Sequence, residues 1–165
     1  MFRMLVRNFI QGIALLITSA AAFSLPNDSK ERLYIVADTT VYNYKAGINT
    51  FEGHVKVDQG STHIVADRLV TKANAQHKIE EAIAYGNTDP AHFWTTPQAN
   101  ELPLHAYAKI IRFYPLVSNV TLEQSVTVKQ GDNRFHGELI HYNNLEQTIT
   151  VPPSKNGRAV LVYNP

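Results

Sequence analysis

The sequence contains no cysteine among its 165 residues. Disulfide bonds therefore cannot contribute to stability, as they do in many small exported domains. A chain of this length can still form one domain with a substantial core. Burial of apolar side chains and pairing of strands must hold such a domain together.

An excess of charge of either sign is also missing. The chain has 15 Lys and Arg residues against 14 Asp and Glu residues. Without residues 1–24, which include Arg3 and Arg7 and no acidic residue, 13 basic and 14 acidic residues remain. The positive field that attracts nucleic acid is therefore absent, and we expect no nucleic-acid partner.

Catalytic signatures are missing as well. The sequence has no Gly-x-Ser-x-Gly elbow, no phosphate-binding loop and no His-x-x-x-His pair on a helix. Of its seven histidines, His54, His63, His136 and His141 fall on the polar phase of alternating segments, which is typical of solvated surface. The sequence therefore predicts no enzyme, no metal site and no cofactor.

The longest apolar stretch is short. It runs from Phe9 to Phe23, follows Arg3 and Arg7, and ends in small residues. A membrane-spanning helix needs about 20 apolar residues, so we expect a cleaved signal peptide over residues 1–24 and a single domain over residues 25–165. Cleavage fits after Ala22 or after Ser24. A retained membrane anchor is the alternative.

From residue 33 onward the apolar residues recur with a period of two. Phe51, Val55 and Val57 alternate with polar residues, which predicts a strand with one covered face. The turn at residues 58–61 leads into a second strand over residues 63–71. The alternation slips beyond Ala66, which indicates a bulge or corner near Ala66 and Asp67.

The same unit recurs in the second half of the chain. FEGHVKVDQG at residues 51–60 corresponds to LEQSVTVKQG at residues 122–131, and the turn glycine of each copy falls at the same place. The offset that maps Phe51 onto Leu122 also maps Ile64 onto Phe135 without a gap. An internal duplication explains this constant offset. The alternative is that any two alternating strands look similar.

The rest of the chain also favours strands. Residues 73–86 have local helix propensity, but their alternation and neighbours predict a strand. Prolines mark residues 90–103 as edge or loop, with Phe93 and Trp94 on opposite faces. Further strands are expected at residues 108–113, 139–142, 147–151 and 159–163. About a dozen short strands and no secure helix make the chain all-β.

The apolar sides of these strands form a surface with no helix to cover it. Two facing antiparallel sheets could fill each other's core, as in an ordinary sandwich. The sheets could instead stand apart and leave a slot for an apolar ligand. The residues alone do not decide between these two arrangements.

Three strings in the sequence resemble the OstA-like family of periplasmic lipopolysaccharide-transport bridge proteins. These are FEGHVKVDQGSTHIVADRLV, YGNTDPAHFW and GELIHY, and the resemblance covers about residues 31–163. Its most specific element is F-x-G-x-V-x-V-x-Q-G followed by I-x-A-D, at residues 51–60 and 64–67. The sequence departs from the family at LEQS, residues 122–125, where a Gly-Asn is usual.

The resemblance implies a twisted, open β-jellyroll of two facing antiparallel sheets that form a V. It implies a periplasmic, non-enzymatic protein that holds the acyl chains of lipid A, the lipid part of lipopolysaccharide, between the sheets. Its partners would be an inner-membrane transport complex, an outer-membrane translocon and further copies of itself, joined head to tail through edge strands such as residues 33–37 and 159–163. A membrane-tethered relative and a structural sandwich without lipid are the alternatives.

Within this framework, the residues expected to line the lipid groove are apolar residues on the inward phase of their strands. They are Leu33, Ile35, Phe51, Val55, Ile64, Phe93, Phe113, Val126 and Phe135.

Overall fold

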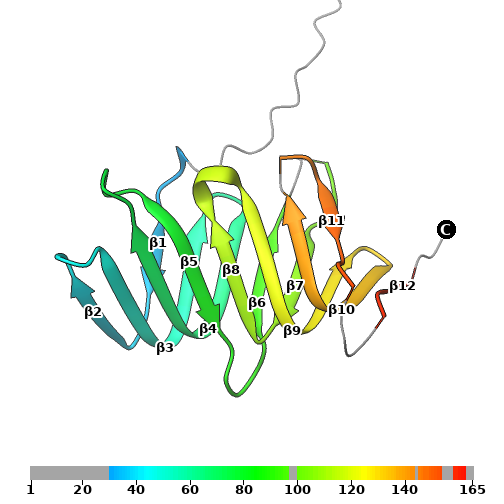
Figure 1. Cartoon of the computed structure of the whole chain (residues 1–165), viewed down its shortest axis with the longest axis horizontal. Helices are drawn as coiled ribbons and strands as arrows, with labels where there is room; N and C mark the ends of the chain where they lie inside the picture. Colours follow the sequence, from blue (N-terminus) through cyan, green and yellow to red (C-terminus); the bar gives the residue numbers. More distant parts are fainter. Residues whose placement is uncertain (1–29, 97–99, 144, 154–157, 163–165) are drawn as a thin grey trace, which may run out of the picture.

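The computed structural model describes residues 30–96, 100–143, 145–153 and 158–162. Within these ranges the chain is all-β, as predicted, and contains no α-helix (Figure 1). The strands are β1 (Tyr34–Val36), β2 (Thr39–Asn43), β3 (Ile48–Gln59), β4 (Thr62–Ala73), β5 (Ile79–Tyr85), β6 (Ala91–Thr95), β7 (Leu104–Ala108), β8 (Ile110–Tyr114), β9 (Asn119–Gln130), β10 (Asn133–Asn143), β11 (Thr148–Thr150) and β12 (Val160–Val162). One 3₁₀ turn, η2 (Pro115–Val117), joins β8 to β9.

The predicted signal peptide lies outside the described residues, as does Tyr163 of the predicted last strand. Among the residues that are described, no helix is long and apolar enough to cross a membrane.

The strands form two facing layers because the four longest strands bend and contribute to both. Layer 1 consists of β2, β5, β8 and β11 with residues 48–52, 68–73, 119–123 and 139–143 of the long strands. Layer 2 consists of β1, β6, β7 and β12 with residues 55–59, 62–66, 126–130 and 133–137. All pairings are antiparallel.

The bends are β-bulges with left-handed backbone. In β3, Gly53 and His54 have φ values of 79° and 47°, and the register shifts there between Glu52 and Val55. The predicted irregularity near Asp67 therefore exists. The extra residue of the bulge, however, lies in β3 and not in β4, because Gly53 and His54 together stand opposite Asp67. In β9 the same bend falls on Gln124 and Ser125, with φ values of 68° and 55°, although neither residue is glycine.

The pairing pattern confirms the predicted duplication. β3 begins at Ile48 and β9 at Asn119, the same offset that relates Phe51 to Leu122 in the sequence. In the first half β3 pairs with β1, β2 and β4, and β4 pairs with β5 and β6; in the second half β9 pairs with β7, β8 and β10, and β10 pairs with β11 and β12. The halves meet where β5 pairs with β8 and β6 pairs with β7, which we call the internal seam.

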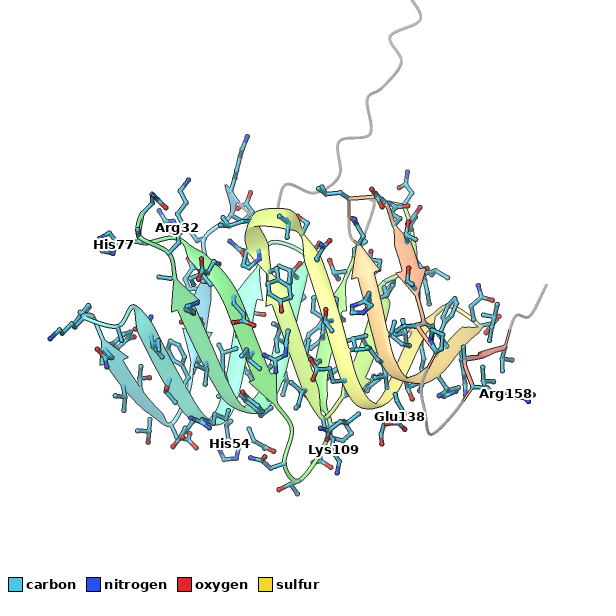
Figure 2. All side chains as sticks on the ribbon, viewed as in Figure 1. Arg32, His54, His77, Lys109, Glu138 and Arg158 are labelled. Carbon is cyan, nitrogen blue, oxygen red and sulfur yellow. The ribbon has the colours of Figure 1, made fainter. Side chains whose placement is uncertain are left out.

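The two long edges of the molecule differ. Along one edge, which we call the spine, the chain crosses between layers at the bends and at the links β1–β2, β5–β6 and β7–β8. The hairpin turns lie along the opposite, open edge. His54, Lys109 and Glu138 accordingly line one edge in Figure 2, and His77 and Arg32 project from the other. The layers thus form a wedge joined by backbone on one side.

The strand predicted within residues 73–86 is confirmed as β5, despite its helix propensity. Ala82 and Ala84 are buried in the core, and the register of β5 joins β4 to β8. Residues before β5 form a tight turn in which the Asn74 side chain accepts bonds from the backbone N–H of Gln76 and Lys78. Tertiary pairing therefore overrides local propensity here.

Candidate functional site

Apolar side chains from both layers face the space between them, and the nine residues predicted to line a groove lie in or beside these two layers. Phe51 and Phe113 face inward from layer 1, and the other seven lie on β1, on the layer 2 strands or, for Leu33, just before β1. The nine residues differ in how deeply they are buried. Phe51, Val55, Ile64, Phe93 and Val126 are buried, whereas Ile35, Phe113 and Phe135 are partly exposed. Leu33 is 39% exposed, at the margin of the space.

One row of inward side chains crosses the whole of layer 2. Successive cross-strand partners place one apolar residue on each of its strands: Ile35, Val57, Ile64, Phe93, Ala106, Val128, Phe135 and Leu161. The row, which we call the apolar track, ends at β1 on one side and at β12 on the other. Its continuity depends on register, which the sequence alone does not supply.

Layer 1 opposes the track with residues that sequence reasoning left out of the groove. Leu69, Ala84, Ile111 and Ile140 form a register row with Phe51 and are all buried. Ile111 shares the alternation phase of Phe113, and Leu69 lies just beyond the predicted slip near Ala66, so both inward positions could have been found from the sequence.

The layers touch in the middle of the molecule. The rings of Phe93 and Phe113 face each other from opposite layers with centroids 6.4 Å apart, and Phe93 is only 2% exposed. Near β1 an apolar slot of about 30 Å³ remains, lined by Leu33, Ile35 and Ile64 among others. That is about the volume one water molecule occupies in the liquid, so the slot is too small for an acyl chain as it stands.

A second inward hollow lies near the other end of the open edge. It has a volume of about 190 Å³ and is lined by Leu104, Gln130, Tyr142 and Ile149, with Glu101 at its margin. Burial, with the Glu101 carboxylate as a smaller cause, raises the pKa of Tyr142 to about 12. The phenol therefore stays neutral at physiological pH.

No charged side chain is buried among the described residues, and the buried polar ones are threonines. Thr62 and Thr95 join their hydroxyls at 3.3 Å, and Thr71 accepts a bond from the Asn49 side-chain amide. An interior of this composition suits hydrocarbon, since none of its buried side chains carries a charge that would need water or an ionic partner.

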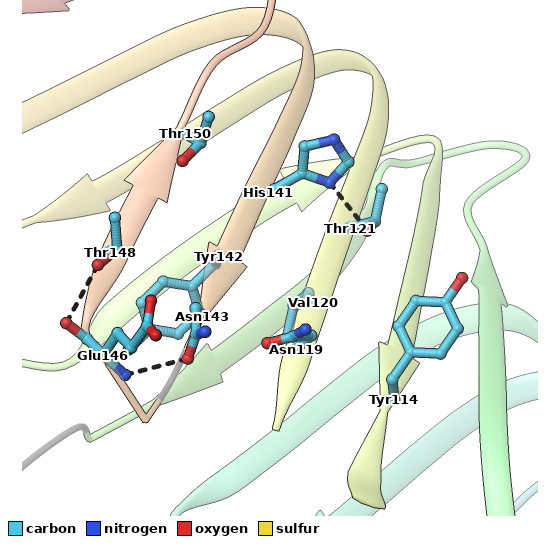
Figure 3. Close-up of a pocket in the computed structure, with 10 residues that line it drawn as sticks. All are labelled: Tyr114, Asn119, Val120, Thr121, His141, Tyr142, Asn143, Glu146, Thr148 and Thr150. Atoms are coloured by element: carbon cyan, nitrogen blue, oxygen red, sulfur yellow. Dashed lines mark hydrogen bonds between the residues drawn. The ribbon is translucent and has the colours of Figure 1, made fainter. Parts of the chain in front are cut away.

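A hollow larger than these two lies elsewhere among the described residues, on the outer face of layer 1 near β11 (Figure 3). It measures about 370 Å³, and its lining combines polar side chains such as Asn119, Thr121 and Asn143 with the buried Val120 and Tyr142. Figure 3 shows the hydrogen bond between Thr121 and His141 on its floor. Because this hollow lies on the outer face and is open to solvent, it would leave an acyl chain in contact with water, and its size does not make it the better candidate.

Ionic contacts connect neighbouring strands on the outer side of the internal seam in layer 1. Arg112 of β8 donates to Glu123 of β9 at 2.7 Å and to Glu81 of β5 at 3.4 Å. The bond to Glu123, followed by other attractions to the two carboxylates, raises the pKa of Arg112 despite its partial burial. The Tyr114 hydroxyl also donates to Glu81, so three strands are tied together.

Stacked rings connect β4, β6 and β7 across the same seam on the outer face of layer 2. His63, Trp94, His92 and Tyr107 stand in sequence, with centroid separations of 4.9, 4.6 and 4.3 Å. The Lys129 amine lies 5.5 Å from the Tyr107 ring. We call this row the aromatic ladder. Burial, and to a smaller extent His105, lowers the pKa of His92 to about 4, so its ring is neutral at pH 7.

The four histidines expected on the surface are placed on outward faces. His54 and His141 are exposed, and His63 and His136 are partly exposed. Each makes a hydrogen bond: His54 to Asp38, His141 to Thr121, His63 to Asp58 and His136 to Thr127. Within the described residues there is no group of three or more His, Cys, Asp or Glu side chains that could hold a metal ion.

A family described as "LptA/(LptD N-terminal domain) LPS transport protein" matches residues 34–148. The lipopolysaccharide export system protein LptH of Pseudomonas aeruginosa is 28% identical over 140 residues, which cover 85% of this chain and 79% of that protein. LptA of Escherichia coli K12 is 28% identical over 159 residues, covering 96% of this chain and 84% of that protein.

The fold agrees with these similarities. The crystal structure of LptH, described as the LptA homologous periplasmic component of the conserved lipopolysaccharide transport device from Pseudomonas aeruginosa, superposes with a TM-score of 0.78 at 24% identity. The match covers 85% of this chain and 100% of that one.

Proposed function

Because this chain belongs to the LptA/(LptD N-terminal domain) family of lipopolysaccharide transport proteins, we propose that it carries lipopolysaccharide through the periplasm with the acyl chains held between its layers. The apolar track is the observation that carries this proposal. It crosses every strand of layer 2 and ends in Ile35 and Leu161 at opposite ends of the molecule. A lipid could therefore stay in contact with apolar side chains along the full length.

The energetics favour a continuous apolar path. Each methylene hidden from water is worth about 0.8 kcal/mol, so exposing an acyl chain of about ten methylenes costs about 8 kcal/mol. Free diffusion of such a lipid through water is correspondingly rare. A track with similar side chains at each step removes this cost and leaves no deep minimum in which the lipid would stop.

Binding requires the closed slot to widen. The layers share backbone connections along the spine, whereas side-chain packing holds them together at the open edge. Separation there breaks contacts such as Phe93 with Phe113 but no strand pairing. The entering acyl chain replaces these apolar contacts with equivalent ones, so the net cost of opening stays small.

A site of this kind moves lipid without covalent chemistry. The energy for transport must then be supplied by other proteins, and we infer an inner-membrane complex that loads the lipid and an outer-membrane translocon that receives it. The periplasm lies between the two membranes, and the predicted signal peptide would deliver the chain there.

Photo-crosslinking tests the site directly. A photoreactive residue at Phe113, inside the wedge, is expected to give a lipopolysaccharide adduct in cells. The same residue at Ile83, which lies in the adjacent strand but faces outward from layer 1, is the matched control. Adducts of equal yield at both positions, or none at Phe113, would contradict an interlayer lipid. A filled structural sandwich predicts no saturable binding of lipopolysaccharide at all.

The internal seam suggests how copies could join. β5 and β6 of the first half pair with β8 and β7 of the second, and β11 and β12 are the counterparts of β5 and β6 at the C-terminal end. Exposed apolar side chains mark both free ends, with Tyr34 and Val36 at one and Val160 and Leu161 at the other. We infer that β11 and β12 of one copy pair with β2 and β1 of the next.

The duplication also predicts the register of this joint. Phe93 pairs with Ile64 in the first half, and Leu161 pairs with Phe135 in the second half. Because Phe135 is the equivalent of Ile64, Leu161 is the counterpart of Phe93. Phe93 also pairs with Ala106, whose equivalent in the first half is Ile35. Leu161 of one copy is therefore expected opposite Ile35 of the next, which would make the apolar track continuous between copies.

The absence of native cysteine makes this register easy to test. A chain with Leu161→Cys and Ile35→Cys is expected to form disulfide-linked ladders of copies under mild oxidation. A chain with Leu161→Cys and Lys45→Cys is the matched control, since Lys45 lies in the turn after β2. Monomers in both, or equal ladders in both, would refute the register.

A further inference from the structure

One glutamine stands at the same place in each half of the duplication, at the end of a long strand. Gln59 ends β3 and Gln130 ends β9, and each lies two residues beyond a valine of the apolar track. Both glutamines therefore share the inward phase of that valine and lie at the open edge of layer 2. The repeated motif that ends in Gln-Gly thus places one side-chain amide at each of two equivalent positions.

The two amides make the same backbone contact. The Nε2 atom of Gln59 donates to the carbonyl of Glu31 at 3.1 Å, and that of Gln130 donates to the carbonyl of Leu102 at 3.2 Å. Glu31 and Leu102 are themselves related by the offset that relates the two halves. This bond orients each amide, and among the described residues it leaves the Oε1 atom without a hydrogen-bond partner.

Each amide lines a hollow between the layers. Gln59 lines the apolar slot near β1, and Gln130 lines the inward hollow near the other end of the open edge. Asn133 of β10 pairs directly with Gln130, and its Oδ1 atom is buried with no hydrogen-bond partner in the part of the chain that the structure describes. A buried acceptor of this kind costs free energy until a donor reaches it. The open edge therefore offers oxygen acceptors to a ligand that brings an N–H or O–H donor.

We propose that Gln59 and Gln130 are two equivalent acceptor sites, each of which binds the donor group at the head of an acyl chain while the hydrocarbon lies between the layers. This inference rests on the proposed function. The acyl chains of lipopolysaccharide join glucosamine through amide and ester links and carry hydroxyls near the carbonyl, so the donor is an amide N–H or a hydroxyl. Apolar side chains beside each glutamine, such as Ile35 at one site and Leu104 at the other, contact the first methylenes.

The two sites define a repeat along the open edge. In layer 2, the strands β4, β6 and β7 separate β3 from β9, so the sites lie about 19 Å apart along the sheet. Where copies join through β12 and β1, the strands β10, β12 and β1 of the next copy separate β9 from the next β3. The spacing is then the same. A moving lipid meets an equal, weak acceptor at each step, and none of these sites holds it much longer than the next.

A pair of uncharged ligands isolates the donor. N-Decanoylglucamine has an amide N–H, whereas N-decanoyl-N-methylglucamine lacks it and keeps the same acyl chain and hydroxyls. Calorimetric titration of the purified protein, below the micelle concentration, should show the first compound bound about threefold to tenfold more tightly, as expected for one hydrogen bond. This preference should disappear in the variant with Gln59→Met and Gln130→Met. Gln76→Met, in the exposed turn before β5, is the matched control and should leave the preference unchanged.

A second variant separates binding from structure, because the methionine substitutions also remove the bonds to the backbone carbonyls. Gln59→Lys with Gln130→Lys keeps a donor for the carbonyls of Glu31 and Leu102 but has no acceptor, and it should lose the preference as fully. An undiminished preference in both double variants, or no preference in the parent although the N-methyl compound binds, would overturn the acceptor role and leave the interlayer site in place. Failure of both compounds to bind the parent would contradict the interlayer site and this inference together.

Discussion

The contact between Phe93 and Phe113 provides the sharpest test of an opening slot. Truncation by Phe113→Ala removes the ring that reaches across from layer 1, where the layers now touch with ring centroids 6.4 Å apart. Substitution of a fully buried Phe by Ala costs about 3–5 kcal/mol. Phe113 is only partly buried, so we expect a loss of about 2 kcal/mol in the free energy of unfolding of the lipid-free protein.

Bound lipopolysaccharide should restore the stability that Phe113→Ala loses. Two or three methylenes that enter the vacated space contribute about 0.8 kcal/mol each, or about 2 kcal/mol together. Because the layers no longer need to separate at this point, lipopolysaccharide should bind Phe113→Ala at least tenfold more tightly than the parent chain, at about 1.4 kcal/mol per factor of ten. Phe113→Asp should instead abolish binding, since the carboxylate would have to leave water.

Thermal unfolding with and without lipopolysaccharide, together with equilibrium titration of the lipid, measures both effects. Ile83→Ala is the control, because it shortens a partly buried side chain on the outward face of the neighbouring strand. It should lower stability without a change in affinity. If Phe113→Ala weakens lipid binding as strongly as Phe113→Asp does, the acyl chains do not enter between these rings.

Three further changes test the fold that holds the slot. Gly53→Ala should destabilise the protein by about 1–3 kcal/mol, since its Cβ would collide with the Asp38 side chain at a φ of +79°, and the added substitution Asp38→Ala should recover part of this in denaturant unfolding. Gln124→Gly should stabilise by up to about 1 kcal/mol, because it relieves a left-handed residue at the equivalent bend; an unchanged or lower denaturation midpoint would refute this. Arg112→Met should cost about 1–3 kcal/mol, since it leaves two partly buried carboxylates without their cation, and an unchanged melting temperature would mean that these ionic contacts are dispensable.

Alkaline pH should reveal the burial of Tyr142. A folded pKa of about 12, raised from 10 by burial and by Glu101, means that this tyrosine contributes stability at pH below 10 that is lost as pH rises through 12. Two pKa units correspond to about 3 kcal/mol. The difference in unfolding free energy between the parent and Tyr142→Phe should therefore shrink over pH 10–12, and a difference constant over that window would contradict the shift.

The local architecture could be predicted because its signals are short-range. Alternation at Phe51, Val55 and Val57 and the constant offset between the two halves are written in the chain, and the strands and the duplication follow from them. The bend in β9 was harder, because Gln124 takes a left-handed φ of 68° without the glycine that signals it in β3. The register of β9 against β10 shifts there between Gly137 and Leu139, as that of β3 against β4 does between Glu52 and Val55.

Membership of the candidate site stays a prediction, and the shape of the space between the layers could not be predicted from the sequence. The sequence predicted that Phe93 and Phe113 point inward, but their positions on facing layers and the distance between the layers depend on packing between residues of different strands. The end of the apolar track at Leu161 was missed for another reason. The spacing from Phe93 to Leu161 is shorter than that from Ile64 to Phe135, mainly because β11 is shorter than its counterpart β5, so a constant offset does not map Phe93 onto Leu161.

The duplication also explains why the joint between copies should be weaker than the internal seam. At the internal seam Arg112 contacts Glu81, but the counterparts of these two residues at the free ends are Val41 and Thr148, which cannot form an ion pair. The aromatic ladder has no counterpart there either, because valines at 160 and 162 replace His92 and Trp94. A joint made from backbone pairing and small apolar side chains is expected to dissociate and reform. The ion pairs and stacked rings of the internal seam instead keep the two halves of each chain together. Transfer of the ion pair to the free ends, by Val41→Arg with Thr148→Glu, should accordingly shift the chain toward longer assemblies in sedimentation, and the single substitutions should not.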